Sequence, residues 1–163
     1  MKLLLKSAVA LALLVALLPL AQATVEVQLV HPEKFSDGLD RWDSQRDELM
    51  KGLAAHLQAT AAKVVPAAQT LKIEVLDLNL AGEMKPFGPS HEMVRVMNQV
   101  SVPSMQVHYV LSQGDQVLRE GSDRLVDLDY LNRFNRYWEN DSLRFDKPMV
   151  DDWVAKEFGR PAK

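Results

Sequence analysis

Residues 71–80 read LKIEVLDLNL, and this stretch decides the fold. Its first five residues alternate apolar and charged side chains, which is the period of a strand with one face on a core. After Val75 the apolar positions shift from odd to even numbers. Two interpretations stay open: in a regular strand Asp77 and Asn79 share the face of Val75, whereas a β-bulge turns them outward and bends the strand.

Four more strands are predicted: residues 25–29 and 105–111, which alternate apolar and polar side chains, and residues 94–102 and about 116–125. The strands at 105–111 and about 116–125 predict a hairpin, because Gly114 followed by Asp115 suits a two-residue turn in which glycine supplies a positive φ. Residues 81–91 contain two glycines and two prolines. They therefore predict an irregular excursion rather than a tight hairpin.

Two helical segments flank the strands. Apolar residues at spacings of three, four and seven predict a long amphipathic helix, capped by Ser44 and ended where Val65 precedes Pro66. Its apolar stripe is Leu39, Trp42, Leu49, Leu53 and Leu57. A second helix is expected to begin near Asp146 and to end at Gly159. The sequence thus predicts an α+β fold: a mainly antiparallel sheet of about five strands, with one long N-terminal helix and C-terminal helices packed on it.

Residues 1–23 have the pattern of a secretory signal peptide: Lys2 and Lys6 at the start, an apolar run over residues 7–20, and small residues at Ala21 and Ala23. The apolar run is shorter than the roughly 18 residues expected of a membrane-spanning helix. We therefore expect cleavage after Ala23, a periplasmic or secreted protein, and no stable membrane insertion after cleavage. Residues 24–163 have the length of a single domain.

Composition narrows the function classes. The leader holds two of the 19 lysines and arginines and none of the 22 acids, so the remainder has a net charge of −5. This charge argues against nucleic acid or anionic lipid as a partner, since both favour clustered basic residues. Without cysteine, thiol catalysis, disulfides and a lipid anchor on an N-terminal cysteine are excluded. We expect no cofactor, and we expect any partner to be an envelope protein.

Several phrases together resemble a bacterial family known only as domain of unknown function 3016. They are HPEKFSD (31–37), LKIEVLDLNLAG (71–82), LVDLDYL (125–131), and LRFDKPM (143–149) followed by Asp152 and Trp153. The resemblance spans nearly the whole chain after the leader, and it implies an exported bacterial protein without assigning an activity. Asn79 stands where the family is usually acidic and Asp146 where it usually has glutamate, so an acidic site built there would be weakened.

Three carboxylates lie at strand ends or just beyond them: Asp77, Asp127 and Asp129. Together with His91 in the Gly/Pro loop they form a candidate acidic site, because calcium and magnesium prefer oxygen ligands. The spacing lacks the glycine and distal glutamate of a calcium loop, and the other interpretation is that Asp127 and Asp129 cap the following aromatic segment. The histidines show no paired metal spacing and no serine nucleophile motif is present, so we assign neither a metal centre nor catalytic residues.

Aromatic residues interleaved with arginines concentrate in the last third of the chain. Two explanations stay open: a packed lid that closes the sheet, or an exposed contact surface of the composition that binding hot spots prefer. The candidate binding surface consists of Arg133, Arg136, Tyr137, Trp138 and Arg144. We expect a noncatalytic binding or accessory module of the bacterial envelope; the alternatives are a metal-assisted hydrolase using the candidate acidic site and a small-ligand carrier.

Overall fold

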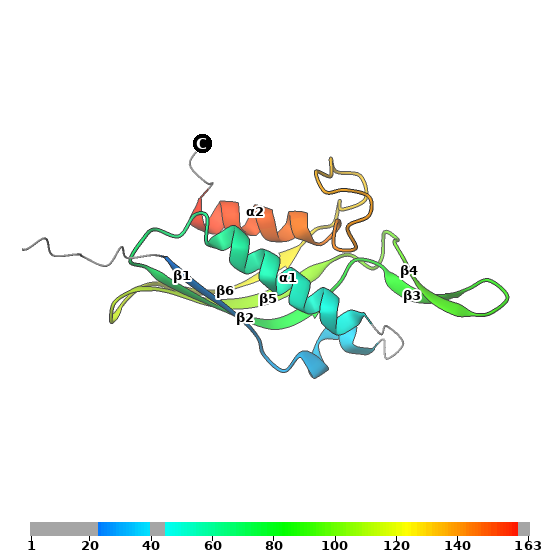
Figure 1. The fold of residues 1–163 in the computed structure, drawn as a ribbon, viewed down its shortest axis with the longest axis horizontal. Coiled ribbons are helices and arrows are strands. Elements are labelled where there is room, and N and C mark those ends of the chain that lie inside the picture. The colour runs from blue at the N-terminus through cyan, green and yellow to red at the C-terminus, as the bar shows by residue number, and fades with distance from the viewer. Residues whose placement is uncertain (1–22, 40–44, 160–163) are drawn as a thin grey trace, which may run out of the picture.

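The computed structural model describes residues 23–39 and 45–159 (Figure 1). The expected leader up to residue 22, the stripe residue Trp42 and the expected cap Ser44 lie outside this described part. The elements in chain order are β1 (Thr24–Leu29), the short 3-10 helices η1 (Pro32–Lys34) and η2 (Ser36–Leu39), α1 (Arg46–Ala61), β2 (Thr70–Asn79), β3 (Glu83–Phe87), β4 (Glu92–Val96), β5 (Ser104–Gln113), β6 (Gln116–Val126) and α2 (Lys147–Phe158).

Four strands form one sheet in the order β1-β2-β5-β6. β1 runs parallel to β2, whereas β2, β5 and β6 pair antiparallel. A parallel pair needs a crossover connection, and α1 lies in the segment that provides it. Figure 1 shows α1 and α2 on the same face of this sheet, and the separate β3–β4 hairpin projecting beyond its end.

The α+β class is confirmed, but three parts of the expected fold are wrong. The sheet is mixed, since β1 and β2 are parallel, and the described residues contain six strands in two sheets. Period-two alternation shows which face of a strand is buried and carries no information about strand direction. The first helix is not long: α1 has 16 residues, begins at Arg46 without a side-chain cap and ends at Ala61, ahead of the proline. One C-terminal helix, α2, lies in the described residues where several were expected, because residues 128–132 form turns and residues 134–136 have no regular structure.

The structure selects the β-bulge interpretation of residues 71–80. The register between β2 and β5 shifts between Val75 and Asp77. Val75 and Leu78 are both buried, whereas Leu76 between them is 43% exposed. The bulge therefore reconciles the two phases of the strand: Ile73 and Val75 before it and Leu78 and Leu80 after it are all buried in the core.

The β5–β6 hairpin is confirmed, with Gly114 at a φ of 56° in its turn. The irregular excursion expected over residues 81–91 is wrong, because β3 and β4 pair there as a second hairpin. Pro86 lies within β3, opposite Met93, in a two-stranded ribbon. Each strand of such a ribbon has a free edge, where proline removes no ladder bond.

The core lies between the helix-covered face of the sheet and the two helices. α1 contributes Leu53 and Leu57, which are fully buried, and α2 contributes Val150 and Val154. At one end, three aromatic rings pack edge to face with centroids 5.4 to 5.8 Å apart: Tyr109, Trp153 and Phe158. Neither helix in the described ranges is long and apolar enough to cross a membrane.

Candidate functional site

Residues 127–146, here called the connecting loop, join β6 to α2 and carry the predicted binding surface. Asn135 fixes the loop in two places: its Oδ1 accepts a hydrogen bond from the Tyr137 amide at 2.9 Å, and its Nδ2 donates to the Arg144 carbonyl at 2.7 Å. Short polar side chains of this kind satisfy backbone groups where no helix or sheet does so. The loop therefore has a defined shape without regular secondary structure.

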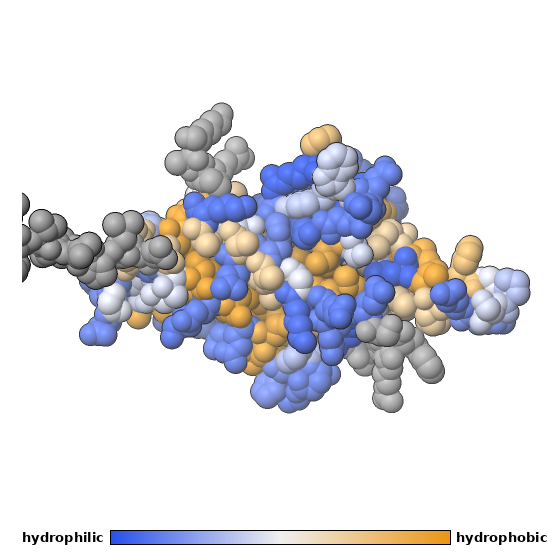
Figure 2. Space-filling model, in the orientation of Figure 1, coloured by the Kyte–Doolittle hydropathy of each residue, from blue (hydrophilic) through white to orange (hydrophobic). Residues whose placement is uncertain are grey.

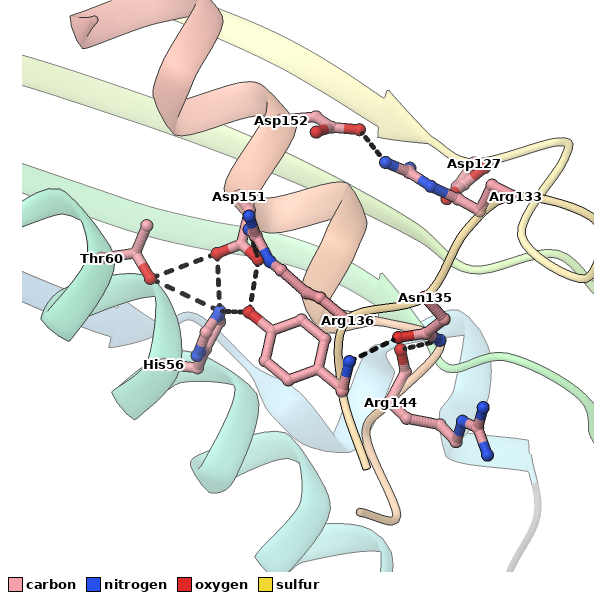
Figure 3. A network of polar contacts seen from close by, with 10 residues as sticks. His56, Thr60, Asp127, Arg133, Asn135, Arg136, Arg144, Asp151 and Asp152 are labelled. Atoms are coloured by element: carbon pink, nitrogen blue, oxygen red, sulfur yellow. Dashed lines mark hydrogen bonds and ion pairs between the residues drawn. The ribbon is translucent and has the colours of Figure 1, made fainter. Parts of the chain in front are cut away.

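A buried carboxylate anchors the connecting loop to both helices (Figure 3). Asp151 on α2 is 7% exposed, and its Oδ1 lies 2.9 Å from Nε2 of His56 on α1. Its Oδ2 accepts hydrogen bonds from the Tyr137 hydroxyl and from the Arg136 guanidinium, both on the loop. Thr60, one turn after His56, donates to Oδ1 at 3.4 Å. We call these five residues the Asp151 network.

Electrostatics fix the protonation states within the Asp151 network. Burial by itself raises the pKa of Asp151, but the hydrogen bonds from its partners outweigh burial and hold that pKa below its usual value. Burial, together with the hydrogen bond to Asp151, raises the pKa of Tyr137 to about 12. Asp151 is therefore ionised and Tyr137 is a neutral donor at neutral pH. A carboxylate with this many partners holds the loop in place and is not free to act as a base.

A second ion-pair group anchors the start of the connecting loop. Arg133 donates to Asp127 Oδ2 at 2.7 Å and to Asp152 Oδ2 of α2 at 2.6 Å. Asp127 is 8% exposed, and its other oxygen accepts the Asp129 amide at 3.1 Å. Arg133 and Asp127 therefore stabilise the loop base, and the capping interpretation of Asp127 describes its contacts.

The structure does not gather the candidate acidic site. Asp77, at the bulge, accepts hydrogen bonds from the amide and hydroxyl of Ser36, each at 2.6 Å. Asp129 accepts from the Asn132 side chain at 3.0 Å, and His91 lies exposed in the β3–β4 turn with a φ of 53°. Within the described ranges, no three His, Asp or Glu side chains are placed to hold a metal ion.

The predicted binding surface divides into side chains that anchor the loop and side chains that project into solvent. Arg133, Arg136 and the Tyr137 hydroxyl point into ion pairs and hydrogen bonds, as described above. Trp138 is 83% exposed, and its neighbour in the loop, Phe134, is 90% exposed. Figure 2 shows a mostly hydrophilic surface over the connecting loop. Tyr130 and Phe145 instead pack against each other edge to face at 5.5 Å, so the segment is packed in one part and exposed in another, and its role as a contact surface stays a prediction.

An open hollow of about 740 Å³ lies in the connecting loop beside Trp138. Arg144 borders it and makes no ion pair with any described residue. The remaining lining residues are polar or aromatic: Asn135, Tyr137, Glu139 and Asn140. Trp138 and Arg144 of the predicted binding surface thus lie together at one concave site.

Sequence reasoning missed the partners of the Asp151 network. His56 and Thr60 stand at i and i+4 on α1, next to the leucine stripe, and this spacing was the available signal. The contact itself joins residues 95 positions apart, which no local pattern encodes. Asp146 was expected at the start of the C-terminal helix, and the family resemblance placed it at a position that is usually glutamate. It is 3% exposed and accepts the Ala81 amide at 2.8 Å, and burial raises its pKa to about 7.

A comparison with family models finds one that matches residues 23–156, described as "Protein of unknown function (DUF3016)". The match begins at the first described residue and leaves out only residues 157–159 at the end of the described structure, so it includes the Asp151 network and the hollow. No curated protein matches the chain.

Proposed function

Because the chain belongs to the family of proteins of unknown function DUF3016, which brings no activity with it, we propose a function from the surface itself. The protein is an exported component of the bacterial envelope that acts by binding, and the exposed aromatic residues of the connecting loop make the contact. Trp138 carries this proposal, because its large apolar side chain is 83% exposed on a loop that is otherwise firmly anchored.

Anchoring matters because binding has an entropic cost. A flexible loop loses conformational freedom when it binds, whereas a loop already held in one shape does not. The Asp151 network and Arg133 hold the connecting loop at both helices. An exposed tryptophan on a fixed support, with arginine nearby, has the composition of a binding hot spot.

The start of the fold supports export. β1 begins at Thr24, directly after the expected cleavage site, so removal of residues 1–23 leaves the first strand complete. The expected signal peptide can be tested by fractionating cells and measuring the mass of the mature protein. We expect a periplasmic or secreted product that begins at Thr24, and a cytoplasmic full-length product contradicts the proposal.

Binding and not acid–base chemistry is the better-supported activity. The candidate carboxylates Asp77 and Asp127 each hold a structural partner, and His91 lies apart in the β3–β4 turn. The observation that supports a small-ligand role is the hollow beside Trp138, which is considered further below.

In-cell photocrosslinking tests the contact surface. A photoreactive residue at Trp138 is compared with one at exposed Lys63, which lies after α1. Trp138 is preferred to Tyr137, because replacing Tyr137 removes a hydrogen bond to Asp151. We expect a discrete adduct from position 138 alone. The same adduct from both positions, or none from position 138, contradicts the proposal.

A further inference from the structure

Arg144 is a half-buried cation that has no acidic partner among the described residues. Five other described arginines form ion pairs with carboxylates: Arg46, Arg95, Arg119, Arg133 and Arg136. Arg124 lacks such a pair as well, but it is exposed on β6 and hydrated by solvent. A guanidinium that is partly withdrawn from water loses hydration, and an anion is its usual compensation.

Within the described residues, no guanidinium N–H of Arg144 has a hydrogen-bond acceptor. Its guanidinium carbon lies 5.0 Å from the Phe145 ring centroid, and its Nε–H is buried without an acceptor in the described part of the chain. Its carbonyl is held by Asn135, so the backbone beneath it is fixed. In Figure 3 the Arg144 side chain points away from the Asp151 network. The Nε–H is enclosed by protein and cannot reach a ligand, so the terminal Nη donors are the ones that an anion in the hollow can meet.

The hollow supplies a second recognition element beside this cation. Trp138 and Arg144 both line it, and the Trp138 ring is 83% exposed. A flat apolar face next to a guanidinium suits a ligand that carries an anionic group beside a ring or apolar group. Glu139 also lines the hollow, so a singly charged carboxylate fits better than a doubly charged phosphate.

We propose that the hollow between Trp138 and Arg144 binds an organic carboxylate. The carboxylate accepts paired hydrogen bonds from the Arg144 guanidinium, and the adjoining ring or apolar group stacks on Trp138. This inference rests on the proposed function, because it names the ligand class of the same surface. A sugar acid and a peptide C-terminus share this chemistry, and the experiment separates them.

Titration followed by NMR tests the site on the mature chain. The Trp138 indole N–H signal, assigned by its loss in Trp138→Phe, reports binding of three probes: benzoate, benzamide and acetate. We expect benzoate to bind at least about tenfold more tightly than either other probe, since only benzoate has both ring and charge. Equal affinity for benzoate and benzamide overturns the proposal.

Variants assign the charge requirement to one residue. Arg144→Gln is expected to weaken benzoate binding by about ten- to a hundredfold, and Arg144→Lys by less, because lysine keeps the charge but loses the planar fork. The matched control Arg124→Gln removes the other described arginine that has no carboxylate partner, and it is expected to leave the affinity unchanged. Spectra of the variants away from the hollow confirm that they are folded. An equal loss in Arg124→Gln, or none in Arg144→Gln, overturns the site.

The two ligand sources and the two proposals can be separated by the same titration. One pair of probes is glucuronate and uncharged glucose. The other pair is a tripeptide with a free C-terminus and the same tripeptide with an amidated C-terminus. The pair in which the carboxylate raises affinity more shows whether the ligand is a sugar acid or a peptide C-terminus. No response to any carboxylate overturns the inference. If crosslinking from position 138 still captures its adduct in that case, the binding role stands and only the ligand class fails.

Discussion

At the scale of single residues, the described structure uses buried charge to position a loop. Asp151 lies in the protein interior and is ionised because its hydrogen-bond partners compensate for lost hydration. Removing one member of a buried pair costs more than the pair contributes, since the other member is left without compensation. The polar contacts at Asp151 are therefore where single substitutions have the largest effect on the loop.

Asp151→Asn is expected to lower the free energy of unfolding by about 2 to 3 kcal/mol at pH 7. This loss is smaller than the loss expected when a fully buried ion pair is broken, because the partner Arg136 is largely exposed. Urea denaturation measures this difference. The matched control is Asp152→Asn at the next position, which removes an exposed partner of Arg133 and is expected to cost less than about 1 kcal/mol. Equal losses in the two variants would show that the Asp151 network is not a stabilising anchor.

The contribution of Asp146 to the stability of the folded protein depends on pH. Its pKa is raised from 3.8 to about 7, chiefly by burial, with Arg95 opposing and Asp37 adding to the effect. The folded state then binds a proton that the unfolded state has released, so this residue's contribution to stability is full below about pH 4 and is lost as pH rises through 7.

Asp146→Asn keeps an acceptor for the Ala81 amide and removes the charge. We expect the variant and the parent to be similarly stable near pH 4, and the variant to be more stable by up to about 4 kcal/mol at pH 8. Urea denaturation across this range measures the two curves. Curves that stay parallel from pH 4 to pH 8 contradict the raised pKa.

At the scale of elements, the β3–β4 hairpin is tied to the rest of the molecule at its base. The Gly82 amide donates to the Ser101 carbonyl at 2.9 Å. The Tyr130 hydroxyl, from the connecting loop, donates to the Asn98 carbonyl at 2.6 Å. Hairpin and connecting loop thus share a junction, and the hairpin's tip, with Phe87 70% exposed, extends away from it.

Gly82→Ala tests this junction. Gly82 has a φ of 81°, and an added Cβ would lie 2.7 Å from the Val96 carbonyl oxygen. We expect a loss of more than about 2 kcal/mol, since backbone strain and a clash with backbone add together. Gly114→Ala is the control: its φ is 56° but a Cβ there meets nothing within 4 Å, so about 1 kcal/mol is expected. Thermal or urea unfolding gives both values, and equal losses contradict the tight junction.

At the scale of the whole molecule, local patterns predicted strands better than their arrangement. The alternation in β2, β5 and β6 and the turn at Gly114 were readable, because burial of one face and glycine's conformational range are local properties. The direction of β1 depends on the path of a crossover, and the β3–β4 hairpin was hidden by its glycines and prolines.

The candidate site was predictable only in part, for a related reason. Aromatic and arginine composition pointed to the connecting loop, and Trp138 is exposed there as one interpretation required. Whether an arginine forms an ion pair depends on residues elsewhere in the chain: Arg136 pairs with Asp151, whereas Arg144 pairs with no described carboxylate. Composition alone cannot distinguish these two arginines. Two of the candidate acidic residues have contacts of different range: Asp77 accepts from Ser36, 41 positions earlier in the chain, and Asp127 accepts from the Asp129 amide, two positions later.

The parallel pairing of β1 with β2 sets an order of assembly. Its register places Thr24 opposite Thr70, so a long segment must be ordered before the pair closes, whereas β5 and β6 meet across a two-residue turn. In pulse-labelled hydrogen exchange we expect β5 and β6 amides to gain protection first and β1 amides last; simultaneous protection contradicts this order. On the proposed export route, β1 crosses the membrane before the other strands and is then the last strand to join the sheet. The precursor therefore stays incompletely folded, and competent for translocation, until its leader is released.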